Sequence, residues 1–165
     1  MVTSMIGLVA FSADKIVEHI KLAANRADQQ ISNYNELATD LSDYIFFTEV
    51  LVKFYSQGWT TKSSLNKIVP RYNNAIIKLR KREYVNLALV HRLWGKKSAN
   101  EFTEIMSLVK RIDALVHELN TEAGAVDSGK KEKVDPAVAK AIIDNIKPLF
   151  KALESKVPLF LIKLY

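Results

Sequence analysis

The chain has 165 residues, a net charge of +6 and no cysteine, so it is long enough to bury one core without disulfides. Five glycines and four prolines are too few for a turn-rich β structure. Composition therefore excludes a disulfide scaffold and favours an all-α protein, which we expect to be soluble and cytoplasmic when made.

The first predicted helix covers about residues 4–25 and opens with the apolar run MIGLVAF at residues 5–11. No basic residue precedes this run, which argues against a signal peptide, and about 20 apolar residues would be needed to cross a bilayer. A helix that packs on one side needs an apolar stripe of only about 100°, yet this run is apolar all round. The surplus indicates a partner or membrane site, with a cap on the core as an equal alternative.

A second helix is predicted over residues 28–56, where apolar side chains recur every three or four positions. The stripe consists of Ile31, Tyr34, Ala38, Leu41, Ile45, Thr48, Val52 and Tyr55. Leu37, Tyr44 and Leu51 widen it, so the helix should pack against more than one neighbour. Its acids are Glu36, Asp40, Asp43 and Glu49, with no basic residue among them.

Gly58 marks the first turn, and a third helix follows to about residue 82, with Pro70 expected to kink it or begin a new turn. A short helix over residues 84–94 halts at Gly95, and another runs from Ser98 to about residue 120. Residues 62–97 hold ten basic side chains against one acid. The densest cluster is Lys78, Arg80, Lys81 and Arg82.

This basic cluster is typical of a solvated helix face, of a contact with anionic lipid or of a nucleic-acid contact. The sequence lacks a helix-turn-helix pattern and interleaved aromatic residues for base stacking, which argues against nucleic acid. An anionic lipid surface therefore stays open as the partner of the cluster.

Residues 121–135 lack apolar periodicity and are predicted to form a flexible linker. Asp135 and Pro136 then begin a last helix, and the chain ends at residue 165 in the unusually apolar tail VPLFLIKLY. Its apolar stripe is Ile142, Ile146, Leu149 and Leu153. We expect a four-helix bundle over residues 1–120 with an additional C-terminal brace helix over residues 136–165.

Little in the sequence points to catalysis. The three histidines fall on three different predicted helices, no nucleophile lies in a recognisable setting, and no glycine-rich loop could hold a phosphate. Asp113 and His117 are one helical turn apart, and an exposed side-chain pair explains them better than a metal site. We expect no enzyme, no cofactor and no metal.

Four stretches resemble the HeLo-like helical bundles of cell-death executioners: MIGLVAF, the helix ending FYSQG, the basic run AIIKLRKREYV, and ALVHRLWGKKSANEFTEIMSLVKRIDALVHEL at residues 88–119. This superfamily includes the fungal HeLo domains, the N-terminal bundle of the mixed lineage kinase domain-like pseudokinase, and the coiled-coil domains of plant helper immune receptors. The resemblance covers residues 5–120. The chain departs from the pattern by having one glycine near its start instead of several, and no kinase, nucleotide-binding or amyloid-forming region.

The resemblance implies a cell-death module of innate immunity that is held in the cytoplasm until an upstream trigger makes it oligomerise with further copies and move to a membrane. It assigns membrane insertion to Met5, Ile6, Leu8, Val9 and Phe11. It assigns contact with acidic phospholipids to Lys78, Arg80, Lys81 and Arg82, and the last helix takes the place of the brace. Two alternatives stay open: an adaptor or oligomerisation bundle without lipid activity, and a nucleic-acid binder that uses the basic face of residues 62–97.

Overall fold

The computed structural model describes the backbone of residues 2–58, 62–127 and 135–165, and the side chains of residues 15, 18–58, 65–121 and 135–165. Within these ranges the chain forms four helices and no strand. They are α1 (Val2–Ser56), α2 (Lys62–Lys81), α3 (Glu83–Asp127) and α4 (Pro136–Leu164). The predicted all-α helical bundle is confirmed.

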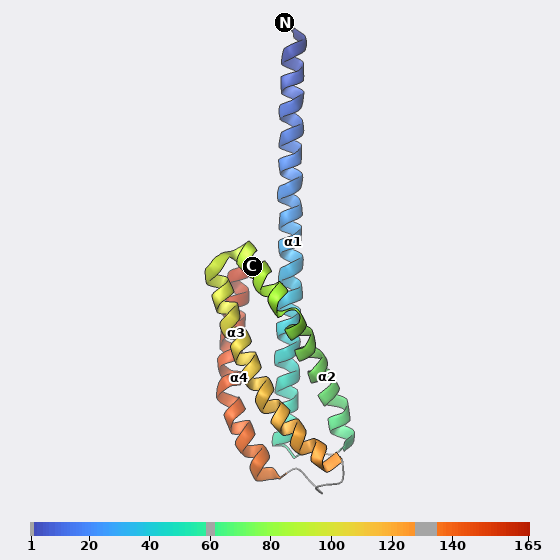
Figure 1. The fold of residues 1–165 in the computed structure, drawn as a ribbon, viewed down its shortest axis with the longest axis vertical. Helices are drawn as coiled ribbons and strands as arrows, with labels where there is room; N and C mark the ends of the chain where they lie inside the picture. The colour runs from blue at the N-terminus through green and yellow to red at the C-terminus, as the bar shows by residue number, and fades with distance from the viewer. Residues whose placement is uncertain (1, 59–61, 128–134) are drawn as a thin grey trace.

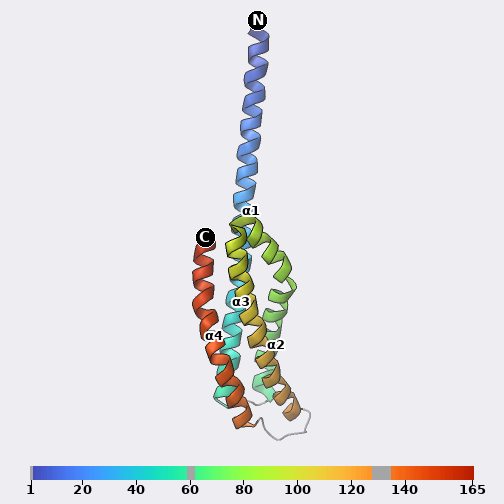
Figure 2. The ribbon, with the colours of Figure 1, turned by 60° about the vertical axis from the view of Figure 1, so that its left-hand side comes forward.

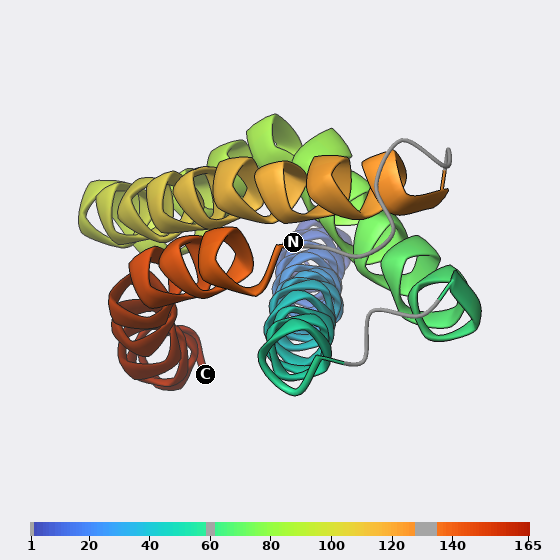
Figure 3. The ribbon, with the colours of Figure 1, turned by 90° about the horizontal axis from the view of Figure 1, so that it is seen from below.

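The four helices run alternately in opposite directions (Figure 1). The chain descends along α1, climbs through α2 and the start of α3, reverses within α3, and climbs again along α4. Seen from below, α1 lies between α2 and α4, and the long part of α3 crosses over them (Figure 3). The most extensive contacts join α3 to α4 and α1 to α2. The last helix is thus one of the four helices of the bundle.

The N-terminal half of α1 projects beyond the bundle as a straight helix (Figures 1 and 2). We call residues 2–28 the arm; at about 1.5 Å per residue it is about 40 Å long. Every described side chain from residue 18 to residue 29 is exposed. Just below the arm, Arg92 donates a hydrogen bond of 2.8 Å to Gln29, and the rings of Tyr34 and Tyr165 are in contact.

The predicted break between residues 25 and 28 is wrong, because α1 is continuous from Val2 to Ser56. The polar run AANRADQQ at residues 23–30 contains neither glycine nor proline, so nothing in its backbone stops a helix. A change from apolar to polar composition was not enough to end the element.

The core confirms the helical period of the second predicted helix. The buried stripe, however, is centred on other residues than the predicted stripe. The buried residues of α1 in the bundle are Leu37, Asp40, Leu41, Tyr44, Thr48, Leu51 and Tyr55. Leu37, Tyr44 and Leu51, expected only to widen the stripe, are 0–3% exposed, whereas Ile31 is 60% exposed. Facing them are Phe102, Ile105, Val109, Ile112 and Val116 of α3, and Ile142, Ile143, Ile146, Leu153, Val157 and Phe160 of α4.

Gly95 reverses the chain inside α3, as the sequence predicted, because its backbone has φ 85° and ψ 177°. Pro70 lies inside α2, which stays a single helix. Pro148 and Pro158 lie inside α4, and that helix changes direction along its length (Figure 2).

The predicted linker is shorter than expected at its start, because α3 continues as a helix to Asp127. Residues 128–134 lie outside the described residues. Asp135 caps α4 as predicted, since its Oδ1 accepts a hydrogen bond of 2.8 Å from the backbone N–H of Ala137, and Pro136 follows in the first turn.

Candidate functional site

The five residues assigned to membrane insertion lie near the free end of the arm. Met5, Ile6, Leu8, Val9 and Phe11 have a helical backbone in α1, and their side chains lie outside the described part of the chain. Figure 1 shows this end of α1 far from the other three helices. Among the described residues, no helix is both long and apolar enough to cross a membrane.

The described part of the arm exposes apolar side chains to solvent. Ile20 is 63% exposed and Leu22 is 49% exposed, and Ile31 just below the arm is also exposed. Packing of an apolar face, more than intrinsic propensity, normally supplies the stability of a helix in water. An unsupported helix with such a face is therefore expected to have a partner.

The buried seam of α1 continues into the arm with the same seven-residue spacing. One series of equivalent positions reads Leu41, Tyr34, Ala27, Ile20, Ala13 and Ile6. The second series reads Leu37, Gln30, Ala23, Ile16 and Val9. We call the positions of both series from residue 6 to residue 34 the arm seam. Division of α1 into two predicted helices hid this continuity, although the spacing itself was readable from the sequence.

Three of the four predicted lipid-binding cations are already paired with carboxylates. Lys78 Nζ lies 2.7 Å from Asp40 Oδ1, and Arg82 pairs with Glu36 and lies 3.6 Å from Asp40 Oδ2. Arg80 pairs with Asp113 on α3 at 3.1 Å. Among the described residues Lys81 makes no ion pair within 4.0 Å, and its side chain is exposed.

Asp40 explains why these cations are held. Its side chain is 1% exposed, and neither carboxylate oxygen has a hydrogen bond of ordinary geometry, so Lys78 and Arg82 balance it mainly by charge. The close polar contact with Asp40 and its negative charge raise the pKa of Lys78. Removing one partner of a buried charge leaves the other uncompensated, so Lys78 and Arg82 carry a structural role.

The Asp113 carboxylate does not pair with His117. Its Oδ1 accepts a hydrogen bond of 3.0 Å from the Tyr72 hydroxyl, and its Oδ2 accepts one from Arg80. His117 is exposed. No group of three histidine or carboxylate side chains that could hold a metal occurs within the described ranges.

The stripe assigned to the brace is part of the core. Ile142, Ile146 and Leu153 are buried and Leu149 is half-buried, and α4 packs chiefly on α3. The rim of this contact is polar. Lys156 pairs with Glu104 at 2.6 Å, Lys163 pairs with Glu101 at 2.9 Å, and Trp94 Nε1 donates to the Leu164 carbonyl at 2.7 Å.

The last turns of α4 lie in the apolar tail noted in the sequence at residues 157–165, and part of this tail is exposed. Leu159 is 61% exposed, Ile162 is 72% exposed and Tyr165 is 97% exposed. We call these three residues the shoulder, because they lie at the end of the bundle from which the arm projects (Figure 1). The ring of Tyr165 lies 5.7 Å from that of Tyr34 on the arm seam. Shoulder and arm seam are therefore contiguous.

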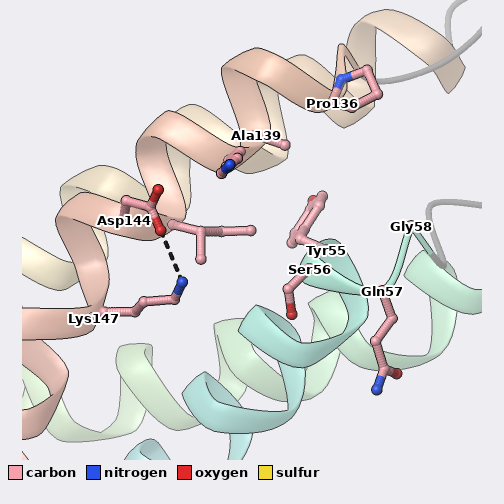
Figure 4. A pocket seen from close by; sticks show the side chains of 10 residues that line it. Tyr55, Ser56, Gln57, Gly58, Pro136, Ala139, Asp144 and Lys147 are labelled. Atoms are coloured by element: carbon pink, nitrogen blue, oxygen red, sulfur yellow. Dashed lines mark hydrogen bonds and ion pairs between the residues drawn. The ribbon is translucent and has the colours of Figure 1, made fainter.

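A cavity of about 590 Å³ lies at the opposite end, between the end of α1 and the start of α4 (Figure 4). Some of its polar side chains are already hydrogen-bonded. Lys147 Nζ donates to Asp144 Oδ1 at 2.8 Å, and the Tyr55 hydroxyl donates to Asn120, outside the cavity lining, at 3.0 Å. Pro136 and Ala139 supply part of its apolar wall. Gln57 and Lys140 also line the cavity, and both are exposed, so no buried polar group marks it as a ligand site.

Comparisons of the chain with protein-family models, with curated proteins and with solved structures found no match. The resemblance to HeLo-like bundles stays a prediction from the sequence.

Proposed function

We propose that the protein is a membrane-permeabilising effector that oligomerises when activated and brings its N-terminal helix to a lipid surface. One observation carries the proposal: α1 runs far beyond the bundle and exposes apolar side chains along its described part. A helix with one apolar face and one polar face can lie in a membrane interface with its apolar side among the acyl chains.

Contact with anionic lipid falls to cations that the bundle does not already use. Lys81 meets this condition within the predicted cluster, and Lys96 and Lys97 next to the reversal at Gly95 are also exposed and without an ion pair in the described structure. Each basic residue close to an anionic surface contributes about 1 kcal/mol of binding free energy. Lys78 and Arg82 could join this surface only if α1 separated from α2.

The same proposal gives α4 the role of a restraint. Its apolar stripe covers the inner face of α3, and its rim is closed by the half-exposed ion pairs of Lys156 and Lys163. Movement of α4 would uncover Phe102, Ile105 and Val109 for contact with other copies.

Dye release from vesicles tests the proposal. Vesicles of phosphatidylcholine with phosphatidylserine should leak, and vesicles of phosphatidylcholine alone should leak less. Ile6→Glu and Phe11→Glu should each abolish leakage because a charge would enter the acyl region. Both variants should keep their thermal midpoint, since this end of α1 lies far from the other three helices (Figure 1). Ser12→Glu, on a polar position of the same helix, is the matched control and should leak normally.

Two results would count against this proposal. One is full leakage by Ile6→Glu and Phe11→Glu. The other is a loss of several kcal/mol in the free energy of unfolding, which is the expected cost of a charge placed in a core.

A specific observation favours an oligomerisation module without lipid activity as the second candidate. The arm holds three basic residues, Lys15, Lys21 and Arg26, against three acids, Asp14, Glu18 and Asp28. A neutral arm has no electrostatic preference for an anionic membrane. This candidate predicts a stable oligomer and no dye release. No comparable observation favours the nucleic-acid alternative, because carboxylates already pair with three cations of the cluster.

A further inference from the structure

The described part of the arm seam and the shoulder form one largely apolar surface that the bundle leaves exposed. Ile20 on the seam is 63% exposed, Ile31 beside the seam is 60% exposed and Ile162 on α4 is 72% exposed. The two parts meet where the rings of Tyr34 and Tyr165 are in contact. Because the seam keeps the spacing that is buried further down α1, its natural partner is another helix of the same kind.

We propose that a second copy of this chain covers this surface, with the two arms packed antiparallel and the tip of each arm on the shoulder of the other copy. The proposal goes beyond the membrane activity and does not depend on it. The arrangement is a closed two-fold dimer in which both copies use the same patch.

The spacing of the seam allows such a pair along the whole arm. In antiparallel helices the two seam series face each other, so a two-fold axis between residues 21 and 22 sets Ile20 opposite Ala23 of the second copy. The same register sets Ile16 opposite Ala27 and Val9 opposite Tyr34. Apolar residues thus meet on both sides of the axis. Gln30, which falls opposite Ala13, is the polar residue in this seam.

The length of the arm brings its tip to the shoulder. With Val9 opposite Tyr34 of the second copy, the preceding turns of the arm extend past the end of that copy's bundle, where Tyr165 contacts Tyr34. The register sets Ile6 opposite Leu37, which the bundle already buries, so in the proposed dimer the tip of the arm leaves the seam there and passes over the end of the bundle. The exposed apolar stripe at that end is Leu159 and Ile162, which the proposal gives to the apolar run of residues 5–11.

The charges of the arm favour a second copy over an anionic surface or a strongly charged partner. Its basic and acidic residues are equal in number and interspersed. On one side of the seam the flanking positions, Ala24 and Ile31, are apolar and widen the contact. On the other side they include His19 and Arg26, so the surface offered to a second arm is apolar along the seam and polar along one edge.

Sedimentation of the full chain at micromolar concentration tests the dimer. The wild type should sediment as a dimer, and Ile20→Glu should shift it to a monomer by placing two charges near the axis. Leu22→Glu is the matched control, because Leu22 is similarly exposed on the same turn but lies off the seam; it should stay dimeric. A wild type that is monomeric at every concentration, whether or not it binds vesicles, would overturn the proposal, as would dissociation by Leu22→Glu alone.

Disulfide trapping tests the orientation, and the absence of native cysteine makes it unambiguous. Ile16→Cys and Ala27→Cys, which face each other in this register, are made as separate chains and oxidised alone and mixed. Each chain then holds a single cysteine, so every disulfide joins two copies. Covalent dimers formed mainly in the mixture support the antiparallel pair. Dimers formed by each variant alone indicate parallel arms and contradict it. The disulfide test can be interpreted in the same way even if the protein releases no dye from vesicles.

Discussion

Three buried tyrosines hold the bundle together at the scale of single residues. The Tyr44 hydroxyl donates to the Val109 carbonyl at 3.2 Å, Tyr72 donates to Asp113, and Tyr55 donates to Asn120. These bonds join α1 and α2 to α3 inside a mainly apolar core. Burial raises the pKa of Tyr44 and Tyr72, and it raises the pKa of Tyr55 to about 12.

We expect alkaline pH to destabilise the fold through these groups. A tyrosine that keeps its proton longer in the folded chain favours folding fully below its unfolded pKa of about 10, and this contribution is lost as pH rises through the folded pKa. For Tyr55 the loss is about 1–3 kcal/mol between pH 10 and pH 12. Urea unfolding at pH 8, 10, 11 and 12 measures it.

Tyr55→Phe should reduce the alkaline loss, although it also removes the hydrogen bond to Asn120 and lowers stability at pH 8. Tyr84→Phe is the control, because that ring is 81% exposed and its loss should leave the pH profile unchanged. An identical pH profile for Tyr55→Phe and the wild type would show that Tyr55 is not responsible.

The pairing of the cations of the basic cluster with carboxylates was not predicted from the sequence. The sequence placed acids on one helix and cations on the next, but treated the cations as a free surface. With a tight turn at Gly58, Asp40 and Lys78 lie at similar distances from the turn on antiparallel helices, so their contact was within reach. The burial of Asp40 was not, because it depends on the packing of the whole bundle around the pair.

At the scale of elements, the predictions succeeded where a residue dictates the backbone. Gly58, Gly95 and the Asp135–Pro136 pair mark real boundaries because each fixes an unusual conformation or satisfies a helix end. They failed at residues 25–28, where only composition changed and the helix continued. The position of α4 within the bundle depended on the merging of two pairs of predicted helices, which periodicity does not determine.

Gly95 is the element-scale position where one methyl group should matter. Its φ of 85° with ψ of 177° is a conformation that essentially only glycine adopts, and an added Cβ would meet no atom within 4 Å. Gly95→Ala should therefore lower the free energy of unfolding by about 1–3 kcal/mol through backbone strain alone. Guanidinium unfolding measures the change.

The opposite sign is expected for Gly124→Ala, because the backbone of residue 124 is helical and alanine is the better helix former by about 0.5–1 kcal/mol. Equal effects from the two substitutions would mean that the reversal at Gly95 does not carry the strain inferred from its dihedral angles.

At the scale of the whole molecule, the protein combines a well-packed bundle with a helix that leaves it. The two halves of α1 share one seven-residue spacing, which is buried in the bundle and exposed at Ile20, Ala23 and Ala27 of the arm. The α3–α4 contact is apolar throughout its core, with the rings of Phe102 and Phe160 stacked at 6.1 Å. The contact of α1 with α2 contains the buried charge of Asp40. Separation of α1 from α2 and movement of α4 are therefore different events, with different groups exposed.

Whether α4 must move for membrane activity is best tested without removing it, because truncation after Glu122 would strip the cover from Phe102, Ile105 and Val109 and so disturb the core itself. Glu104 and Lys156 face each other across the rim of the α3–α4 contact, with their charged groups 2.6 Å apart, and both side chains are exposed. Glu104→Cys with Lys156→Cys, joined by a short bismaleimide, ties α4 to α3 and leaves the core unchanged. If α4 is a restraint that must swing away, the linked protein should lose most of its dye release, and amides of residues 142–153 should stay protected from hydrogen exchange on vesicles. Each single-cysteine variant treated with the same reagent is the control and should leak like the wild type. Undiminished leakage by the fully linked protein would show that α4 stays in place as an ordinary core helix, and would leave the arm as the moving part.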